Sequence, residues 1–258
     1  MTAMPMIEVK DVKKIYKVGA TALHALDGVS FTVEEGEFCC IVGRSGSGKS
    51  TLLNLMAGLE PVTSGQIIIA GKHVEKMKES ELILFRQKNI GLVFQSFNLI
   101  PSLTALENTA LPLTFRGLGR RAREKRAMEM LKAVGLATHA KHKPSQMSGG
   151  QQQRTGLARA LVLNPKIIFA DEPTGNLDSK TSEEMMELIT GLMKQRRQTF
   201  IMVTHDPSMA AYADKVIHML DGRIIDMTVN ARGAPQTPSP EPETQSMQHI
   251  QDQRSLMP

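Results

Sequence analysis

The chain has 258 residues, and its 31 lysines and arginines outnumber its 26 aspartates and glutamates, which gives a formal net charge of +5. A chain of this length can bury a complete α/β core with a smaller appended lobe. It contains no run of about 18 apolar residues, which excludes a predicted membrane-spanning helix, and it does not begin with a basic and then apolar leader. We therefore expect a cytoplasmic protein.

The first part of the chain is predicted to be rich in β-structure. A strand-like segment at 7–9 opens it, and a turn at 34–37 leads to an apolar run at 38–42. Such a run is typical of a strand buried on both faces of a parallel sheet. Cys39 and Cys40 are neighbours in this run and should point to opposite faces, so we expect no disulfide between them and a reducing compartment.

A glycine-rich loop follows this strand and matches the pattern G-x4-G-K-[ST]. We expect its residues to bind a nucleotide; they are Gly43, Arg44, Ser45, Gly46, Ser47, Gly48, Lys49 and Ser50. Apolar side chains at helical spacing over 52–59 predict a helix directly after the loop, which is the context that phosphate binding requires. The loop N–H groups and the positive end of that helix would both face the phosphates. Lys49 is predicted to reach the β and γ oxygens and Ser50 to ligate Mg²⁺, the alternative being a plain turn rich in glycine and serine.

The middle of the chain is predicted to hold a short strand pair at 64–75 and then a mostly helical lobe at 96–145. The lobe begins with an apolar loop at 97–101, which is either a docking surface for a partner or a plain hinge between domains. Basic side chains then gather before and along a helix that ends near Gly135: Arg116, Arg120, Arg121, Arg123, Lys125 and Arg126. The apolar stripe of that helix favours a solvated outer face for these charges, with anionic lipid headgroups as the second interpretation. Nucleic acid is the least favoured, and we expect no nucleic-acid partner.

The segment Ser148-Gly149-Gly150-Gln151 is predicted to begin a helix that runs through Arg159. Serine is a favoured N-cap residue, and the two glycines leave backbone N–H groups open at the positive end of the helix. Such a helix start binds anions well, although an ordinary capped helix would have the same pattern.

Two further apolar runs, at 167–170 and 200–204, predict buried strands. The first ends in Asp171 and Glu172. Two adjacent carboxylates after a buried strand cost free energy of folding unless a bound group or a reaction requires them. Asp171 is predicted to hold Mg²⁺ and Glu172 to polarise an attacking water, and alternation along the strand would aim the two side chains in different directions. The alternative is a solvated acidic turn.

The second of these strands is followed by His205, which alone would be an ordinary loop histidine. Its position favours a functional role, because Gly43, Asp171 and His205 each follow the carboxyl end of a predicted parallel strand. That edge is where open α/β sheets bind their ligands. We therefore expect the three residues to lie close together.

The last part of the chain divides at about residue 229. An Asp-Gly pair within 220–224 predicts a β-hairpin. Farther on, prolines and glutamines replace large apolar side chains, and we expect a disordered tail over 230–258. The folded domain is predicted to span 1–229.

In combination these motifs resemble the nucleotide-binding subunits of ABC transporters, and the resemblance covers roughly residues 6–227. In the terms of that family, Walker A is 43–50, Walker B is 167–171, the signature is 147–151 and the D-loop is 175–178. One departure is Met147, where the family most often has leucine. The two side chains are apolar and similar in volume, so we expect little consequence.

The resemblance implies an α/β fold with a P-loop NTPase core of the RecA-like type, an antiparallel β subdomain and a helical subdomain inserted over about 96–160. It implies hydrolysis of ATP, with ATP and Mg²⁺ bound. It also assigns roles: the catalytic residues are Lys49, Glu172 and His205; the metal ligands are Ser50, Gln95 and Asp171; further nucleotide contacts come from Tyr16, Thr51 and Gln95; and the D-loop supplies Asp178.

The resemblance further implies a homodimer. In this family two subunits pack head to tail and sandwich two ATP molecules, so that Ser148, Gly149, Gly150 and Gln151 of one subunit touch the γ-phosphate held by the other. A separate integral-membrane permease subunit would dock near Gln95 and the helical subdomain. The protein would then be peripheral on the inner face of the cell membrane.

Two segments, 91–95 and 172–179, look like the MacB-, LolD- and FtsE-type branch of the family. Membrane partners in that branch typically have four transmembrane helices and a large extracytoplasmic domain, which implies export or mechanical transmission across the membrane. The alternative is a regulatory ATPase of the cell-division type that gates an extracytoplasmic partner without moving cargo. A DNA-repair or ribosome-associated ATPase is disfavoured because no long heptad run interrupts the motifs, and an importer subunit is disfavoured weakly.

Overall fold

The computed structural model describes residues 4–19 and 21–230. Apart from Asn230, the expected tail therefore lies outside the described residues. The strands are β1 (Ile7–Val18), β2 (Thr21–Val33), β3 (Phe38–Val42), β4 (Ser64–Ile69), β5 (Lys72–His73), β6 (Ile90–Phe94), β7 (Ile167–Asp171), β8 (Thr199–Thr204), β9 (Lys215–Leu220) and β10 (Arg223–Val229). The α-helices are α1 (Lys49–Met56), α2 (Glu79–Asn89), α3 (Ala105–Phe115), α4 (Arg120–Ala133), α5 (Gly149–Leu161) and α6 (Ser179–Arg196). Short 3-10 helices span Val74–Lys76, Ala137–His139, Pro144–Gln146 and Pro207–Tyr212.

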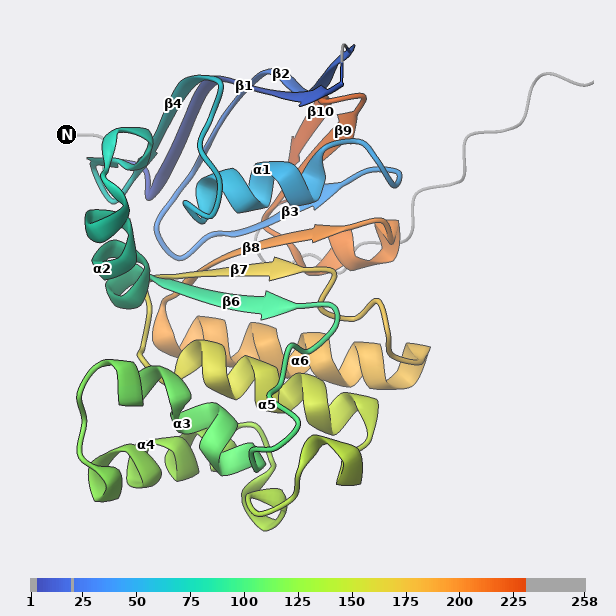
Figure 1. The fold of residues 1–258 in the computed structure, drawn as a ribbon. Coiled ribbons are helices and arrows are strands. Elements are labelled where there is room, and N and C mark those ends of the chain that lie inside the picture. Colours follow the sequence, from blue (N-terminus) through green and yellow to red (C-terminus); the bar gives the residue numbers. More distant parts are fainter. Residues whose placement is uncertain (1–3, 20, 231–258) are drawn as a thin grey trace, which may run out of the picture.

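Two sheets organise the molecule (Figure 1). The larger sheet has the order β10-β9-β3-β8-β7-β6, and all its neighbouring strands run parallel except the antiparallel pair β9 and β10. The smaller sheet, β2-β1-β4-β5, is antiparallel. Together with the helical lobe, these sheets confirm the predicted α/β core with an antiparallel β subdomain.

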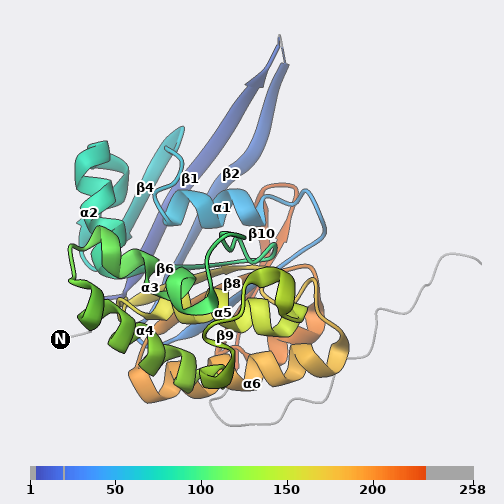
Figure 2. The same ribbon diagram turned by 60° about the horizontal axis from the view of Figure 1, so that its bottom comes forward.

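The helices form layers on the two sides of the larger sheet. Helix α1 lies between the two sheets, whereas α5 and α6 cover the opposite face, with α3 and α4 beyond them (Figures 1 and 2). Among the described residues, no helix has the length and apolar character needed to cross a membrane.

Strand β3 is buried on both faces and therefore belongs to two hydrophobic cores. Cys39 and Ile41 pack with α1 and the antiparallel sheet, whereas Cys40 and Val42 pack with α5, α6 and the helical lobe. Both cysteines are free thiols with no exposed area. The prediction of opposite faces and no disulfide is confirmed.

The predicted hairpin joins β9 and β10 through a two-residue turn. Asp221 and Gly222 have φ values of 47° and 75°, as the twist of such hairpins requires. The N–H of Gly222 donates to the carbonyl of Ser47 at 3.1 Å, so the hairpin supports the glycine-rich loop from behind. Beyond β10, the side chain of Asn230 donates to the carbonyl of Ala213 at 2.9 Å.

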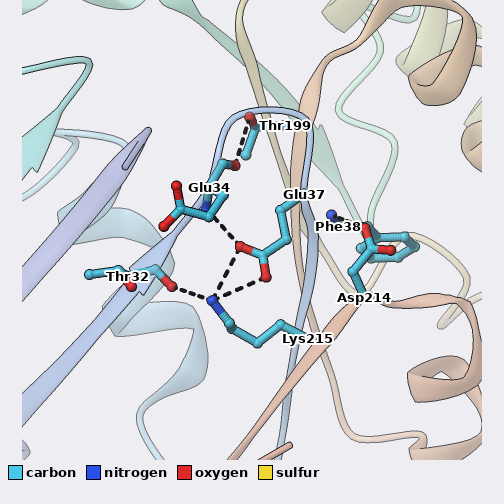
Figure 3. A network of polar contacts seen from close by, with 7 residues as sticks. All are labelled: Thr32, Glu34, Glu37, Phe38, Thr199, Asp214 and Lys215. Carbon is cyan, nitrogen blue, oxygen red and sulfur yellow. Dashed lines mark hydrogen bonds and ion pairs between the residues drawn. The ribbon is translucent and has the colours of Figure 1, made fainter. Parts of the chain in front are cut away.

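A polar network ties strand starts together at the amino edge of the parallel sheet (Figure 3). The Lys215 ammonium, on the first residue of β9, lies 3.1 and 3.2 Å from the two carboxylate oxygens of Glu37, one residue before β3. The same ammonium donates to the carbonyl of Thr32 at 2.8 Å, and Glu37 accepts from the N–H of Glu34 at 2.6 Å. The side chains of Lys215 and Glu37 are only 15% and 8% exposed, so this ion pair is largely withdrawn from water.

Candidate active site

Three residues at the ends of strands meet at the carboxyl edge of the parallel sheet. Gly43 follows β3, Asp171 ends β7 and His205 follows β8, and β8 lies between the other two strands. Parallel strands in register place these chain positions side by side. The edge predicted from the sequence is therefore the edge that the structure assembles.

The glycine-rich loop can adopt its course only with glycine at two positions. A Cβ on Gly43 would lie 2.4 Å from the carbonyl oxygen of Met219, and a Cβ on Gly48 would lie 2.4 Å from that of Ala25. Gly48 also has a φ of 94° and precedes the first residue of α1. The loop thus passes directly into the helix start, where free N–H groups favour an anion.

Lys49 lies beneath the loop and is only 5% exposed. Its ammonium donates to the carbonyls of Gly43 at 2.8 Å and Arg44 at 2.9 Å. Burial lowers the pKa of Lys49, and the carboxylates of Glu172 and Asp171 oppose this effect. The ammonium therefore lies among carbonyl acceptors of the loop itself.

Ser50 and Asp171 bring the two Walker motifs together. The hydroxyl of Ser50 donates to Oδ1 of Asp171 at 3.0 Å. Burial raises the pKa of the Asp171 carboxyl; the bond from Ser50 lowers it, the charge of Glu172 raises it and the charge of Lys49 lowers it. A hydroxyl and a carboxylate at this distance supply the hard oxygen ligands that Mg²⁺ prefers, so these residues fit that ion.

Glu172, the residue after Asp171, pairs with His205. Its Oε1 lies 2.9 Å from Nδ1 of His205, and the two side chains are 19% and 57% exposed. Glu172 does not continue the strand, as its φ of 45° is left-handed and β7 ends at Asp171. The expected strand alternation is therefore wrong; a turn in the backbone, not the pleat, separates the two carboxylates.

Gln95 lies next to this carboxylate and next to the D-loop. A Cβ on Gly175 would lie 2.8 Å from Nε2 of Gln95 and 3.2 Å from Oε2 of Glu172, so only glycine leaves both side chains in place. The amide of Asn176 donates to the backbone carbonyl of Gln95 at 2.9 Å. This bond joins Gln95, the residue after β6, to the turn that follows β7.

The signature segment forms a capped helix start, as predicted. The N–H of Gln151 donates to the hydroxyl of Ser148 at 3.3 Å, and the N–H of Ser148 donates to the side chain of Gln151 at 3.1 Å. Gly149 and Gly150 pack against the D-loop and the start of α6. Among the described residues, none of the side-chain hydrogen bonds of Ser148 and Gln151 reaches the phosphate loop.

The sequence does not predict two contacts of α5. Nε2 of His139 lies 3.2 Å from the side-chain nitrogen of Gln151, so this ring extends the cap of the signature helix. Arg159 donates to the carbonyls of Phe97 and Asn98, two consecutive residues with left-handed φ values of 59° and 47°. The guanidinium therefore holds the strained segment that follows Gln95. No local sequence pattern predicts either contact, because both depend on how the helical lobe packs against neighbouring segments.

The remaining expected nucleotide residues lie around the loop. Arg44 and Ser45 are exposed at its tip, and Thr51 is half-buried in α1. The hydroxyl of Tyr16 donates to Glu60 at 2.5 Å, and the Lys14 ammonium lies 4.8 Å from the centre of its ring.

The D-loop residue Asp178 caps α6. Its carboxylate accepts from the N–H and the hydroxyl of Thr181 at 3.0 and 2.7 Å, and these bonds lower its pKa.

Comparison with known proteins decides which family this site belongs to. The family model described as ABC transporter matches residues 26–175. The chain belongs to the ABC transporter family. It is 48% identical over 222 residues to an uncharacterized ABC transporter ATP-binding protein, MJ1508, of Methanocaldococcus jannaschii, covering 86% of this chain and 99% of that protein.

Further relatives refine the placement of this ABC protein. It is 46% identical to the macrolide export ATP-binding/permease protein MacB of Chlorobaculum tepidum, covering 90% of this chain but only 36% of MacB. The dimeric structure of MJ0796, an ABC transporter cassette, superposes with a TM-score of 0.81 at 46% identity and covers 87% of this chain and 98% of that one. MJ0796 has also been solved as a dimer in a post-hydrolysis state with ADP and Pi, at 45% identity. The chain is an ATP-binding subunit of an ABC transporter and an ATPase, and its resemblance to the MacB-type branch is confirmed.

Proposed function

We propose that this ABC ATPase works as a head-to-tail homodimer with ATP held between Walker A of one subunit and Ser148–Gln151 of the other. The observation that carries the hydrolytic part of the proposal is the pair of contacts Ser50–Asp171 and Glu172–His205 at one sheet edge. The capped start of α5 is an anion-binding end that makes no side-chain bond to the described phosphate loop of its own chain. A phosphate held by a second subunit would be a ligand for that helix end.

The chain's own residues divide the work of hydrolysis. Glu172 accepts the proton of the attacking water and orients it in line with the γ-phosphorus, while His205 holds that carboxylate in position. Lys49 and the loop N–H groups stabilise the charge that develops on the phosphate oxygens. Ser50, Asp171 and Gln95 would hold Mg²⁺, which would supply positive charge to neutralise the phosphate oxygens.

Mixing two inactive variants tests the shared site. Lys49→Ala removes the phosphate lysine and Ser148→Arg blocks the signature, so we expect neither homodimer to hydrolyse ATP. A mixed dimer regains one intact site, so an equal mixture should recover about a quarter of the wild-type rate if subunits exchange at random and each site works alone. Steady-state phosphate release measures this. Zero recovery, despite mixed dimers seen by differently sized tags, would overturn the head-to-tail arrangement.

We further propose that a separate integral-membrane subunit docks on the helical lobe and holds the protein at the cytoplasmic face of the membrane. A cavity of about 350 Å³ lies between α3 and α4, and its walls include Leu103, Leu106, Leu111, Arg120, Arg123 and Glu124. The fully buried side chain of Asn108 shapes the adjoining loop through bonds to Ile100, Leu103 and Thr104. A recess lined by both leucines and charged side chains therefore lies next to the segment that follows Gln95.

The match to MacB favours export or mechanical transmission as the work done on that membrane subunit. A regulatory ATPase that gates an extracytoplasmic partner without cargo remains the second candidate, because the hydrolytic residues would be the same. Gln95 would sense the hydrolysis state beside Glu172 and Asn176 and relay it to the lobe, which begins directly after it in the chain.

Affinity purification from membranes tests the proposed partner. Tagged Glu172→Gln protein, solubilised in mild detergent with ATP and Mg²⁺, should retain a four-helix membrane subunit with a large external domain. The matched control is the same protein with Leu106→Glu in the cavity wall, which should lose that subunit while still binding ATP and forming the dimer. Recovery of ribosomes or DNA without a membrane protein would contradict the transporter assignment.

A further inference from the structure

The stretch from Phe115 to Arg126 is a dense block of positive charge. Between residues 116 and 126 there are six basic side chains and one acidic one, which gives +5, the same as the formal charge of all 258 residues. Phe115, directly before this stretch, is 70% exposed. An exposed aromatic ring beside a block of positive charge is a combination that a merely solvated helix face does not need.

These charges also work against the helix that carries them. Helix α4 begins at Arg120 with no acidic residue in its first turn and no side-chain cap at Gly119. Basic side chains at a helix N-terminus oppose the macrodipole. Helix α3, in the same lobe, begins instead with the reciprocal cap of Thr104 and Glu107. The placement of the arginines therefore lowers the stability of α4.

The surrounding surface adds apolar area to this patch. The guanidinium of Arg116 donates to the carbonyl of Gln87 at 2.8 Å, which joins the end of α3 to α2. One helical turn before Gln87, Leu84 is 68% exposed, and its neighbour Ile83 is 43% exposed. Both ribbon views place α2, the end of α3 and the start of α4 along one side of the molecule (Figures 1 and 2).

We propose that this surface, formed by Phe115, Arg116, Arg121, Lys125 and Arg126, binds the anionic headgroups of a lipid bilayer. Basic side chains near an anionic leaflet are attracted to it, and an exposed phenylalanine adds apolar area that can be buried at the interface. The patch also continues the wall of the cavity between α3 and α4, since Arg120 and Arg123 line it. A membrane subunit seated there would bring the patch toward the bilayer.

Lipid is favoured over nucleic acid by the apolar component. Phe115 and Leu84 contribute exposed carbon surface that phosphate contacts do not require, whereas an interfacial surface buries it. The charge contribution can be estimated, because each basic residue near an anionic surface contributes about a fivefold gain in apparent affinity.

Co-sedimentation with protein-free vesicles tests the surface independently of any membrane subunit. The dimeric ATPase is mixed with vesicles of phosphatidylcholine alone or with 30% phosphatidylglycerol, a content of about one anionic lipid in three. We expect binding only to the anionic vesicles, weakening as salt rises. The variant Arg121→Gln/Lys125→Gln/Arg126→Gln should lose affinity on the order of a hundredfold, and Phe115→Ser should lose several-fold. All four side chains are exposed, so ATP hydrolysis in solution should be retained.

The matched control replaces three exposed lysines elsewhere, Lys72, Lys76 and Lys194, by glutamine. It changes the net charge equally and should bind vesicles nearly as well as the wild type. An equal loss in this control would show a nonspecific charge effect and overturn the proposal. Binding that RNA abolishes by competition and that Phe115→Ser leaves unchanged would identify a nucleic-acid surface and overturn it as well. Because hydrolysis is measured separately, failure of the lipid surface leaves the proposed ATPase cycle standing.

Discussion

Glu172→Gln should reduce ATP turnover by about 100- to 10,000-fold while leaving ATP binding intact, because it removes a general base without removing volume. Oε1 of Glu172 lies 2.9 Å from His205, whereas the residues proposed to bind phosphate are the loop and Lys49, whose ammonium donates to the loop carbonyl of Gly43. Glutamine can keep a hydrogen bond to the histidine but cannot accept the proton of the attacking water. The bound nucleotide should therefore persist and hold the dimer closed.

Two measurements on the purified variant separate these effects. Phosphate release gives the turnover, and equilibrium binding of ATP with size-exclusion chromatography gives the affinity and the dimer. The matched control is Glu183→Gln, an exposed glutamate on α6, which should hydrolyse ATP at the wild-type rate. Turnover by Glu172→Gln close to the wild-type rate would show that another group serves as the base.

Glu37→Gln should lower the free energy of unfolding by about 3–5 kcal/mol, because it leaves the Lys215 ammonium without a charged partner in a site largely closed to water. For a domain of this size each kcal/mol shifts the melting temperature by about 2–4 °C, so the melting temperature should fall by roughly 10 °C. Chemical denaturation with urea gives the free energy, and calorimetry gives the melting temperature.

A double-mutant cycle distinguishes the ion pair from simple loss of packing. Lys215→Met alone leaves the Glu37 carboxylate without a charged partner. The double variant Glu37→Gln/Lys215→Met removes both charges and should regain much of the stability. The control Glu8→Gln acts on the more exposed pair with Lys10 and should cost less than about 0.5 kcal/mol. Equal destabilisation by the Glu8 and Glu37 changes would mean that burial contributes nothing to the network in Figure 3.

The parts of the site that sequence predicts well are those whose contacts are local or follow from sheet topology. Ser148 and Gln151 cap the same helix turn, and Gly43, Asp171 and His205 meet because parallel strands end at one edge. A serine before a helix predicts the cap, and a hydrophobic run followed by a polar residue predicts a position at the sheet edge.

Other elements leave no such pattern. Helix α2 carries four consecutive apolar residues, from Leu82 to Phe85, and without helical spacing this run predicts no amphipathic helix. The clamp of Arg159 on the carbonyls of Phe97 and Asn98 joins positions 62 and 61 residues apart. Only the packing of the lobe against the Gln95 segment brings them together. The left-handed turn at Glu172 is equally hidden, because glutamate has no intrinsic preference for that conformation.

The two faces of β3 give this protein a built-in pair of chemical reporters. Cys39 and Cys40 are the only cysteines of the chain, and each belongs to a different core. Burial raises the pKa of Cys40 to about 12 and that of Cys39 well above its usual range, so neither forms the reactive thiolate while its layer stays closed. The labelling rate of each thiol, with the other replaced by alanine, would therefore time the opening of one side of the sheet separately from the other.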